Sequence, residues 1–109
     1  MAHDDMYVVM YKIIAYLYDC MKHGVAPDSS CWGPEAMGIP EPYWIQVVRE
    51  LVEHDLIAGV KIAYSENRAT VVPFDPRVTM EGVAFTQENS MMGRARQFLQ
   101  DAKAAIPFV

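Results

Sequence analysis

Three side chains that can recognise a nucleic acid recur at every third position in one short stretch: Tyr43, Gln46 and Arg49. On a helix, Gln46 could pair with adenine and Arg49 with guanine, while Tyr43 could reach a phosphate. Lys61 and Arg68 follow in the next stretch and could contact the phosphate backbone. These five residues form our candidate surface for double-stranded DNA.

The charge of the chain argues against this use of the helix. From residue 41 to residue 55 there are four acidic side chains and one arginine, a net charge of −3. Over all 109 residues the formal net charge is −5, which repels the phosphate backbone at long range. Gln46 and Arg49 can therefore also be interpreted as the solvated side of an amphipathic helix, and the acidic residues around them favour that interpretation.

A protein-interaction module is the competing class of function. Tyr43 and Ile45 leave apolar area near the start of the same helix, and exposed apolar patches often mark interfaces between proteins. Both side chains can instead belong to the core, which is the usual place for apolar residues at helical spacing. We keep a protein partner that contacts Tyr43 and Ile45 as the alternative to DNA.

An enzyme is not expected, because catalysis needs a nucleophile, a base and an orienting group close together. The three histidines are scattered along the chain, and no basic residue neighbours Cys31 in the sequence. Cys20 and Cys31 alone cannot form a disulfide scaffold or a zinc site, so we expect two reduced thiols. We expect no metal and no cofactor.

The remaining composition is typical of a cytoplasmic protein. Hydrophobic residues make up 52% of the chain without any low-complexity tract, so a folded core is expected. No apolar run reaches the about 18 residues of a membrane span. Asp4 and Asp5 stand where a signal peptide would carry basic residues, so we expect neither secretion nor contact with a membrane.

The candidate residues need a helix and a hairpin to position them. Apolar spacing predicts an amphipathic helix that opens at 39–42 and closes at 55–57, with one face formed by Trp44, Val47, Val48, Leu51 and Asp55. Before it, Pro34 can begin a brief helix that ends near Gly38. The short helix, tight turn and longer helix have helix-turn-helix proportions.

Two β-like runs, 60–64 and 70–72, follow this helix with only a short polar turn at 65–69 between them. A helix followed at once by a hairpin is the core of a winged helix. Proline cannot donate to a strand ladder, so the segment from Pro73 to Pro76 should end the second strand. The loop at 26–32 could add one short strand, which would make the wing three-stranded instead of two-stranded.

The first helix needs more cover than an ordinary surface helix. Asp4 or Asp5 can cap a helix that runs to about His23, with Gly24 just beyond its end. This helix is apolar over roughly 220° of its circumference, about twice the width of a core-facing stripe, so it must be covered on two sides.

The C-terminal part of the chain offers the second cover. Thr79 can cap a short helix that runs to about Glu88, and Asn89-Ser90 has the pattern of a C-cap followed by a new N-cap. A last helix from 91 to about 105 carries an apolar stripe of Met91, Ala95, Phe98, Leu99, Ala102 and Ile106. If this stripe does not cover the first helix, a homodimer should, because exposed apolar surface costs about 25 cal/mol per Å².

Five segments, taken in order, resemble the YjcQ family of small winged-helix proteins from Firmicutes and their phages: 11–18, 37–40, 47–57, 78–83 and 88–92. The resemblance covers most of the chain and implies a winged helix with extra C-terminal helices in a cytosolic setting. The family has no established activity, so the resemblance implies no catalytic residues. Asp55 departs from the winged-helix pattern, which often has glycine before the first wing strand, and Thr86 stands where leucine is usual.

We therefore predict one α+β, mainly α, domain over residues 1–109. It is a winged helix-turn-helix with a core at about 4–88, and its C-terminal helix, at about 90–105, packs on the first helix. The predicted function is a DNA-binding transcriptional regulator of phage or bacterial origin, with a protein-interaction adaptor as the alternative. Either could act as a monomer or as a homodimer.

Overall fold

The computed structural model describes residues 1–102, which form a winged helix with two further helices. The predicted α+β fold with a two-stranded antiparallel sheet is therefore confirmed. Ile106 and the predicted end of the last helix near residue 105 lie outside the described residues. The elements, in chain order, are α1 (Met6–His23), α2 (Ser29–Trp32), α3 (Pro34–Met37), α4 (Glu41–Glu53), β1 (Ile57–Ser65), β2 (Arg68–Val78), α5 (Met80–Glu88) and α6 (Ser90–Asp101).

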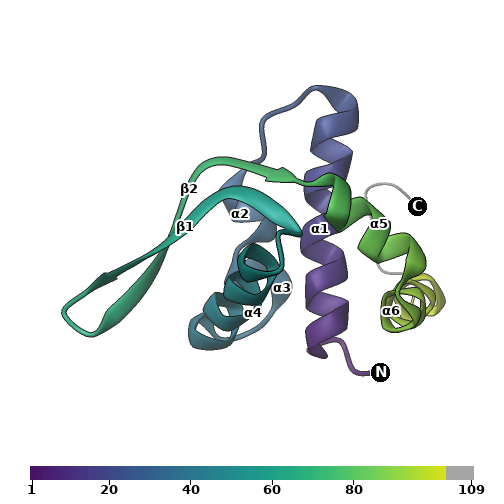
Figure 1. Cartoon of the computed structure of the whole chain (residues 1–109). Helices are drawn as coiled ribbons and strands as arrows, with labels where there is room; N and C mark the ends of the chain where they lie inside the picture. Colours follow the sequence, from purple (N-terminus) through teal and green to yellow (C-terminus); the bar gives the residue numbers. More distant parts are fainter. Residues whose placement is uncertain (103–109) are drawn as a thin grey trace.

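The first helix stands at the centre of the molecule (Figure 1). Its N-terminus is capped by the Asp5 side chain, which accepts a hydrogen bond from the Tyr7 backbone N–H at 2.9 Å, and it ends at Gly24 in the left-handed conformation, as the sequence predicts. The helices α2 and α4 pack on one side of α1, and α5 and α6 pack on the other. The broad apolar surface is thus covered on two sides by the chain itself, burying Val8, Val9, Met10, Tyr11, Ile13, Ile14, Ala15, Leu17 and Cys20.

The start of α6 differs from the prediction by one residue. Asn89, not Ser90, is the N-cap, and its side-chain oxygen accepts hydrogen bonds from the backbone N–H groups of Met91 and Met92. The buried stripe shifts accordingly: Met92 is fully buried and Met91 is only half-buried. The remaining buried members of the stripe are Ala95 and Leu99, whereas the predicted member Ala102 is exposed.

The fourth helix ends at Glu53, earlier than predicted, with His54 as its C-cap. Asp55 has a φ of 57°, so it leaves the helix in the left-handed conformation, and this is the position where winged helices often have glycine. Thr86, the other departure from the family pattern, is buried, and its hydroxyl donates to the carbonyl of Val83 at 2.7 Å. A local hydrogen bond therefore satisfies the polar group that replaces leucine.

The wing is an antiparallel hairpin in which Ser65 pairs with Arg68. The two turn residues, Glu66 and Asn67, have φ values of 49° and 64°. Two successive left-handed residues make the type I′ turn, whose twist matches that of the flanking strands. The hairpin extends past α4 on the side of the molecule away from α6 (Figure 1).

The second strand does not end at Pro73, so that prediction was wrong. It continues to Val78, which pairs with Ile57, while Pro73 pairs with Val60. The pairing register shifts between Ala58 and Val60, where β2 contributes more residues than β1. A proline is tolerated in an edge strand when the position of its missing N–H faces away from the partner, and the open edge of β2 allows this.

A third strand does not form among the described residues, because the sheet has the order β1-β2. Residues 29–32 are helical instead, since the Asp28 side chain accepts a hydrogen bond from the Ser30 backbone N–H and caps α2. The loop after α1 and residues 74–77 of β2 line one hollow.

Candidate functional site

Three of the five predicted DNA-contacting residues line one open groove between α4 and the tip of the hairpin. They are Gln46, Arg49 and Arg68. The groove has a volume of about 310 Å³, and Ile45 lines it as well. We call it the tip groove; its other lining residues are Glu41, Pro42, Asn67 and Ala69.

Arg49 of α4 is held by two neighbours, Gln46 on the same helix and Tyr64 on β1. One guanidinium nitrogen donates to Gln46 Oε1 at 3.1 Å, and another donates to the Tyr64 hydroxyl at 2.7 Å. The guanidinium carbon also lies 5.7 Å from the centre of the Tyr64 ring, within cation–π distance. Our sequence analysis did not include Tyr64, although the alternation of the strand places it on the same face as Ile62.

The other two basic candidates do not extend this group into a positive strip. Arg68 Nη2 lies 3.8 Å from Glu41 Oε1, so a carboxylate stands beside its charge. Lys61 is exposed and precedes Ile62 in the strand, so its side chain points to the opposite face of the hairpin. The positive charges of the predicted surface are therefore separated or paired.

Tyr43 lies on a different side of α4 and contacts the start of the chain. Its hydroxyl donates to the Asp4 carbonyl at 2.7 Å. Burial of the ring raises the pKa of Tyr43, and the charges of Asp5 and Asp4 raise it further. Ile45 is only 8% exposed. The apolar area that the sequence placed at these two residues is thus largely closed within the chain.

Exposed apolar side chains gather instead where the hairpin joins the helices. Met21, Val25, Phe74 and Met80 are exposed by 53%, 59%, 69% and 82%. They line two hollows, of about 480 and 510 Å³, and Met21 lines both of them. We call these four residues and the two hollows the wing-base surface. The sequence analysis did not identify this surface, because its residues come from α1, the following loop, β2 and α5, which are separated along the chain.

The two charged residues that line the first hollow, among those described, form an ion pair. Arg77 donates to the Asp75 carboxylate at 2.9 Å, and both residues line the first hollow. The Lys22 ammonium lies 4.8 Å from the centre of the Tyr18 ring. Among the described residues, those that line the second hollow carry no charged side chain. This surface is therefore apolar and close to neutral.

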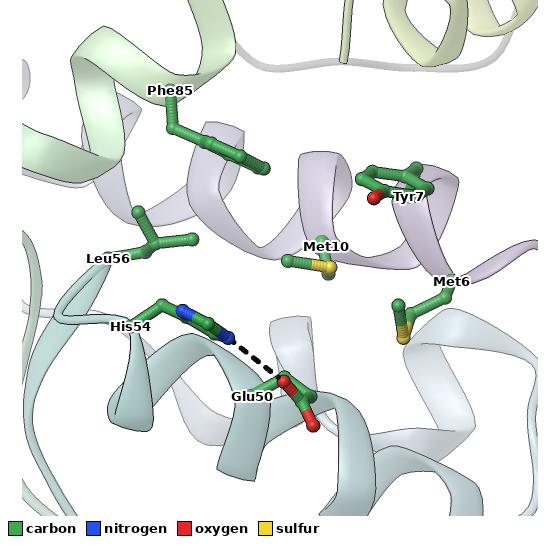
Figure 2. Close-up of a pocket in the computed structure, with 7 residues that line it drawn as sticks. All are labelled: Met6, Tyr7, Met10, Glu50, His54, Leu56 and Phe85. Carbon is green, nitrogen blue, oxygen red and sulfur yellow. Dashed lines mark ion pairs between the residues drawn. The ribbon is translucent and has the colours of Figure 1, made fainter. Parts of the chain in front are cut away.

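A third hollow lies between α1, α4 and α5, and we call it the three-helix hollow. It has a volume of about 380 Å³. Figure 2 shows Phe85 from α5 opposite the ion pair of Glu50 and His54 from α4, with Met10 from α1 between them. The Glu50 oxygen and His54 Nε2 are 3.2 Å apart. The other lining residues are Met6, Tyr7 and Leu56.

Within residues 1–102, no group of three or more His, Cys, Asp or Glu side chains is placed to hold a metal ion. Cys20 is buried and Cys31 is exposed, and neither forms a disulfide. In the same range, no helix is long and apolar enough to cross a membrane.

Comparisons with known proteins give the family of the chain. No curated protein matches it. Among solved structures, the chain is similar to the solution NMR structure of the YjcQ protein from Bacillus subtilis. The sequence identity is 19% and the TM-score is 0.42, and the match covers 72% of this chain and 91% of the YjcQ chain. Residues 11–105 match the family described as YjcQ protein. This match spans most of the sequence, so the chain belongs to the YjcQ family.

Proposed function

We propose that this winged helix is a protein-interaction module that binds its partner through the wing-base surface. The observation that carries the proposal is the clustering of Met21, Val25, Phe74 and Met80 around two adjoining hollows. Monomeric proteins rarely leave a contiguous apolar patch on their surface unless it serves an interface. Two basic side chains expected to contact DNA, Arg49 and Arg68, have amide, aromatic or acidic neighbours within the chain.

The chemistry of the surface defines the partner. Since Asp75 and Arg77 neutralise each other and no charged group lines the second hollow, long-range attraction contributes little to binding. Burial of apolar area supplies the free energy instead, at about 25 cal/mol per Å². The expected partner is a protein with an exposed, uncharged apolar surface, whose side chains fill the two hollows while Phe74 and Met80 pack against it.

Site-specific photo-crosslinking in cells tests this proposal. A photoreactive amino acid in place of Met80 should give one discrete adduct with a protein, because this side chain is 82% exposed and lines the second hollow. The matched control is the same amino acid in place of Tyr64, which is 67% exposed in the tip groove region. The purified partner should bind the wild-type chain and lose binding to Met80→Asp.

Three results would count against a protein-interaction role at this surface. They are no adduct at position 80, equal adducts at positions 64 and 80, and a purified partner that binds Met80→Asp as well as the wild type. Light scattering of the purified chain separates a foreign partner from a second copy. A dimer that Met80→Asp converts to a monomer would show that the partner is the chain itself.

DNA binding is the second candidate, favoured by one observation. Arg49 and Arg68 line the same open groove, next to Gln46, on the helix and wing that dock on DNA in other winged helices. A regulator should retain a particular duplex at low salt, and Arg49→Ala or Arg68→Ala should weaken retention. Retention that falls with rising salt and depends on both arginines would favour the regulator over the adaptor.

A further inference from the structure

We propose that the three-helix hollow is a second docking site, which accepts the apolar face of a basic amphipathic helix from a protein. It lies between α1, α4 and α5, away from the residues of the wing-base surface. The inference therefore goes beyond the proposed function and does not depend on it.

The size and lining of the hollow fit large apolar side chains. Its volume of about 380 Å³ falls in the range of about 300–1,000 Å³ that is usual for binding pockets. Five of its seven lining residues are apolar or aromatic: Met6, Tyr7, Met10, Leu56 and Phe85. Amphipathic helices bind in such grooves by inserting apolar residues spaced by one helical turn.

The two methionines give the hollow an adaptable wall. Met10 is 4% exposed in the core, whereas Met6, one turn earlier on α1, is 38% exposed. Unbranched thioether side chains can repack around different apolar partners, and such residues are frequent on surfaces that bind helices. The side chains in Figure 2 surround an open space, with Met6 and Phe85 at its ends.

The charges beside the hollow select a basic partner. Glu50 lines it with a carboxylate oxygen 3.2 Å from His54 Nε2, and the Glu50 side chain stays 43% exposed. Among the described residues that line the hollow there is no lysine or arginine. Glu53 and Asp55 follow on the same segment and are exposed, and α5 carries Glu81 and Glu88 without any basic residue. Arg49, the arginine of α4, donates to Tyr64 in the wing. A helix with lysines along its edges would gain attraction here, whereas an acidic helix or a nucleic acid would be repelled.

Methionine methyl NMR of the intact chain tests the proposal. The probe is a synthetic amphipathic helix of leucine and lysine, and its control has glutamate in place of every lysine. The lysine peptide should shift the methyl signals of Met6 and Met10 and leave those of Met21 and Met80 unchanged. The glutamate peptide should shift none of them. Shifts confined to Met21 and Met80 would place the peptide on the wing-base surface and overturn the proposal.

A charge reversal supplies a matched pair of variants. Glu50→Lys reverses a charge at the hollow, and Glu66→Lys makes the same change in the exposed turn of the hairpin. The lysine peptide should bind Glu50→Lys about tenfold more weakly than the wild type, because like charges then face each other. Binding to Glu66→Lys should change less than twofold.

The variants also separate a general charge effect from a site. Equal weakening by the two reversals would mean that net charge alone attracts the peptide, and it would contradict a site at the hollow. The unfolding midpoint of each variant shows that it is folded. Met6→Ser, at a partly exposed position, gives a second measure: it should weaken the peptide without altering the charge, and an unchanged affinity would also count against the site.

Discussion

The tip and the base of the hairpin carry opposite kinds of surface. At the tip, polar groups satisfy one another: Arg49 donates to Gln46 and Tyr64, and Arg68 lies beside Glu41. At the base, Phe74 and the side chains around it are apolar and exposed. A side chain of a type that can bind a ligand is therefore less available to that ligand when another side chain of the fold already holds it. The comparison teaches that availability, more than residue type, separates the two candidate functions.

The largest expected effect tests the irregular pairing that shapes the base. Gly59 has a φ of 76°, and a Cβ at this position would overlap the backbone carbonyl of Asp75. We expect Gly59→Ala to lower the free energy of unfolding by at least about 3 kcal/mol, because a left-handed residue with a side chain would also have to displace that backbone. Urea denaturation measures the change.

Gly93→Ala is the control for this substitution. Gly93 lies within α6, and a Cβ there would meet no atom within 4 Å. The free energy of unfolding should rise by about 0.5–1 kcal/mol, since alanine has the higher helix propensity. A Gly59→Ala variant as stable as the wild type would mean that β2 does not follow this path at the base, and the wing-base surface would lose its shape.

The second prediction contrasts two methionines, one in the core and one in the wing-base surface. Met92→Ser should cost about 2–5 kcal/mol, because Met92 is fully buried against α1. Met80→Ser should change stability by no more than about 0.5 kcal/mol, because the side chain is 82% exposed. Thermal unfolding followed by circular dichroism compares them. Strong destabilisation by Met80→Ser would mean that Met80 serves folding and is not free to bind a partner.

Much of the fold could be predicted from local patterns. Capping residues and apolar spacing are signals that extend over only a few neighbouring positions. The bounds of α1, the start of α5 and the hairpin turn depend on such signals, and they agree with the sequence analysis. Pro73 was misread because the tolerance of β2 for proline depends on which edge of the strand is unpaired. That property belongs to the assembled sheet and leaves no local signal.

The candidate site was harder to predict than the fold. Arg49 and Gln46 were identified by their types, but the hydrogen bond that Arg49 donates to Tyr64 joins α4 to β1, two elements whose contact the sequence does not show. The wing-base surface brings together Met21 and Phe74, which are far apart in the sequence. Phe74 lies between Pro73 and Pro76, where the sequence predicted the end of the strand. Its neighbours along the chain gave no indication that its side chain would stay exposed.

A smaller effect measures how firmly the tip is paired. In a double-mutant cycle, Arg49→Ala and Tyr64→Ala should show a coupling energy of about 0.5–1 kcal/mol, typical of an exposed charged hydrogen bond with a cation–π contact. Urea denaturation of the wild type, both single variants and the double variant gives this value. A coupling near zero would free Arg49 for DNA and weaken the contrast between tip and base.

The smallest expected effect depends on pH and lies near the loop that borders the wing-base surface. Hydrogen bonds donated by the Ser30 backbone N–H and then by its hydroxyl hold the pKa of the Asp28 carboxyl below its usual 3.8. Because the pKa is lower in the folded state, this stabilisation is complete above the unfolded value and is lost as the pH falls through the folded value.

Asp28→Asn isolates that contribution, since asparagine can cap α2 in the same way without titrating. The difference in free energy of unfolding between wild type and variant should shrink as the pH is lowered from about 6 to about 2.5. A difference that stays constant over this range would mean that the charge of Asp28 does not stabilise the loop.

The central claim is that the partner of this winged helix is a protein bound at the wing base and not DNA bound at the tip. Photoreactive residues placed at positions 80 and 69, in two otherwise identical chains in the same cells, compare the two regions directly, because Ala69 lines the tip groove and its replacement keeps Gln46, Arg49 and Arg68. We predict a discrete protein adduct at position 80 and no nucleic-acid adduct at position 69. A nucleic-acid adduct at position 69, with none at position 80, would contradict the account.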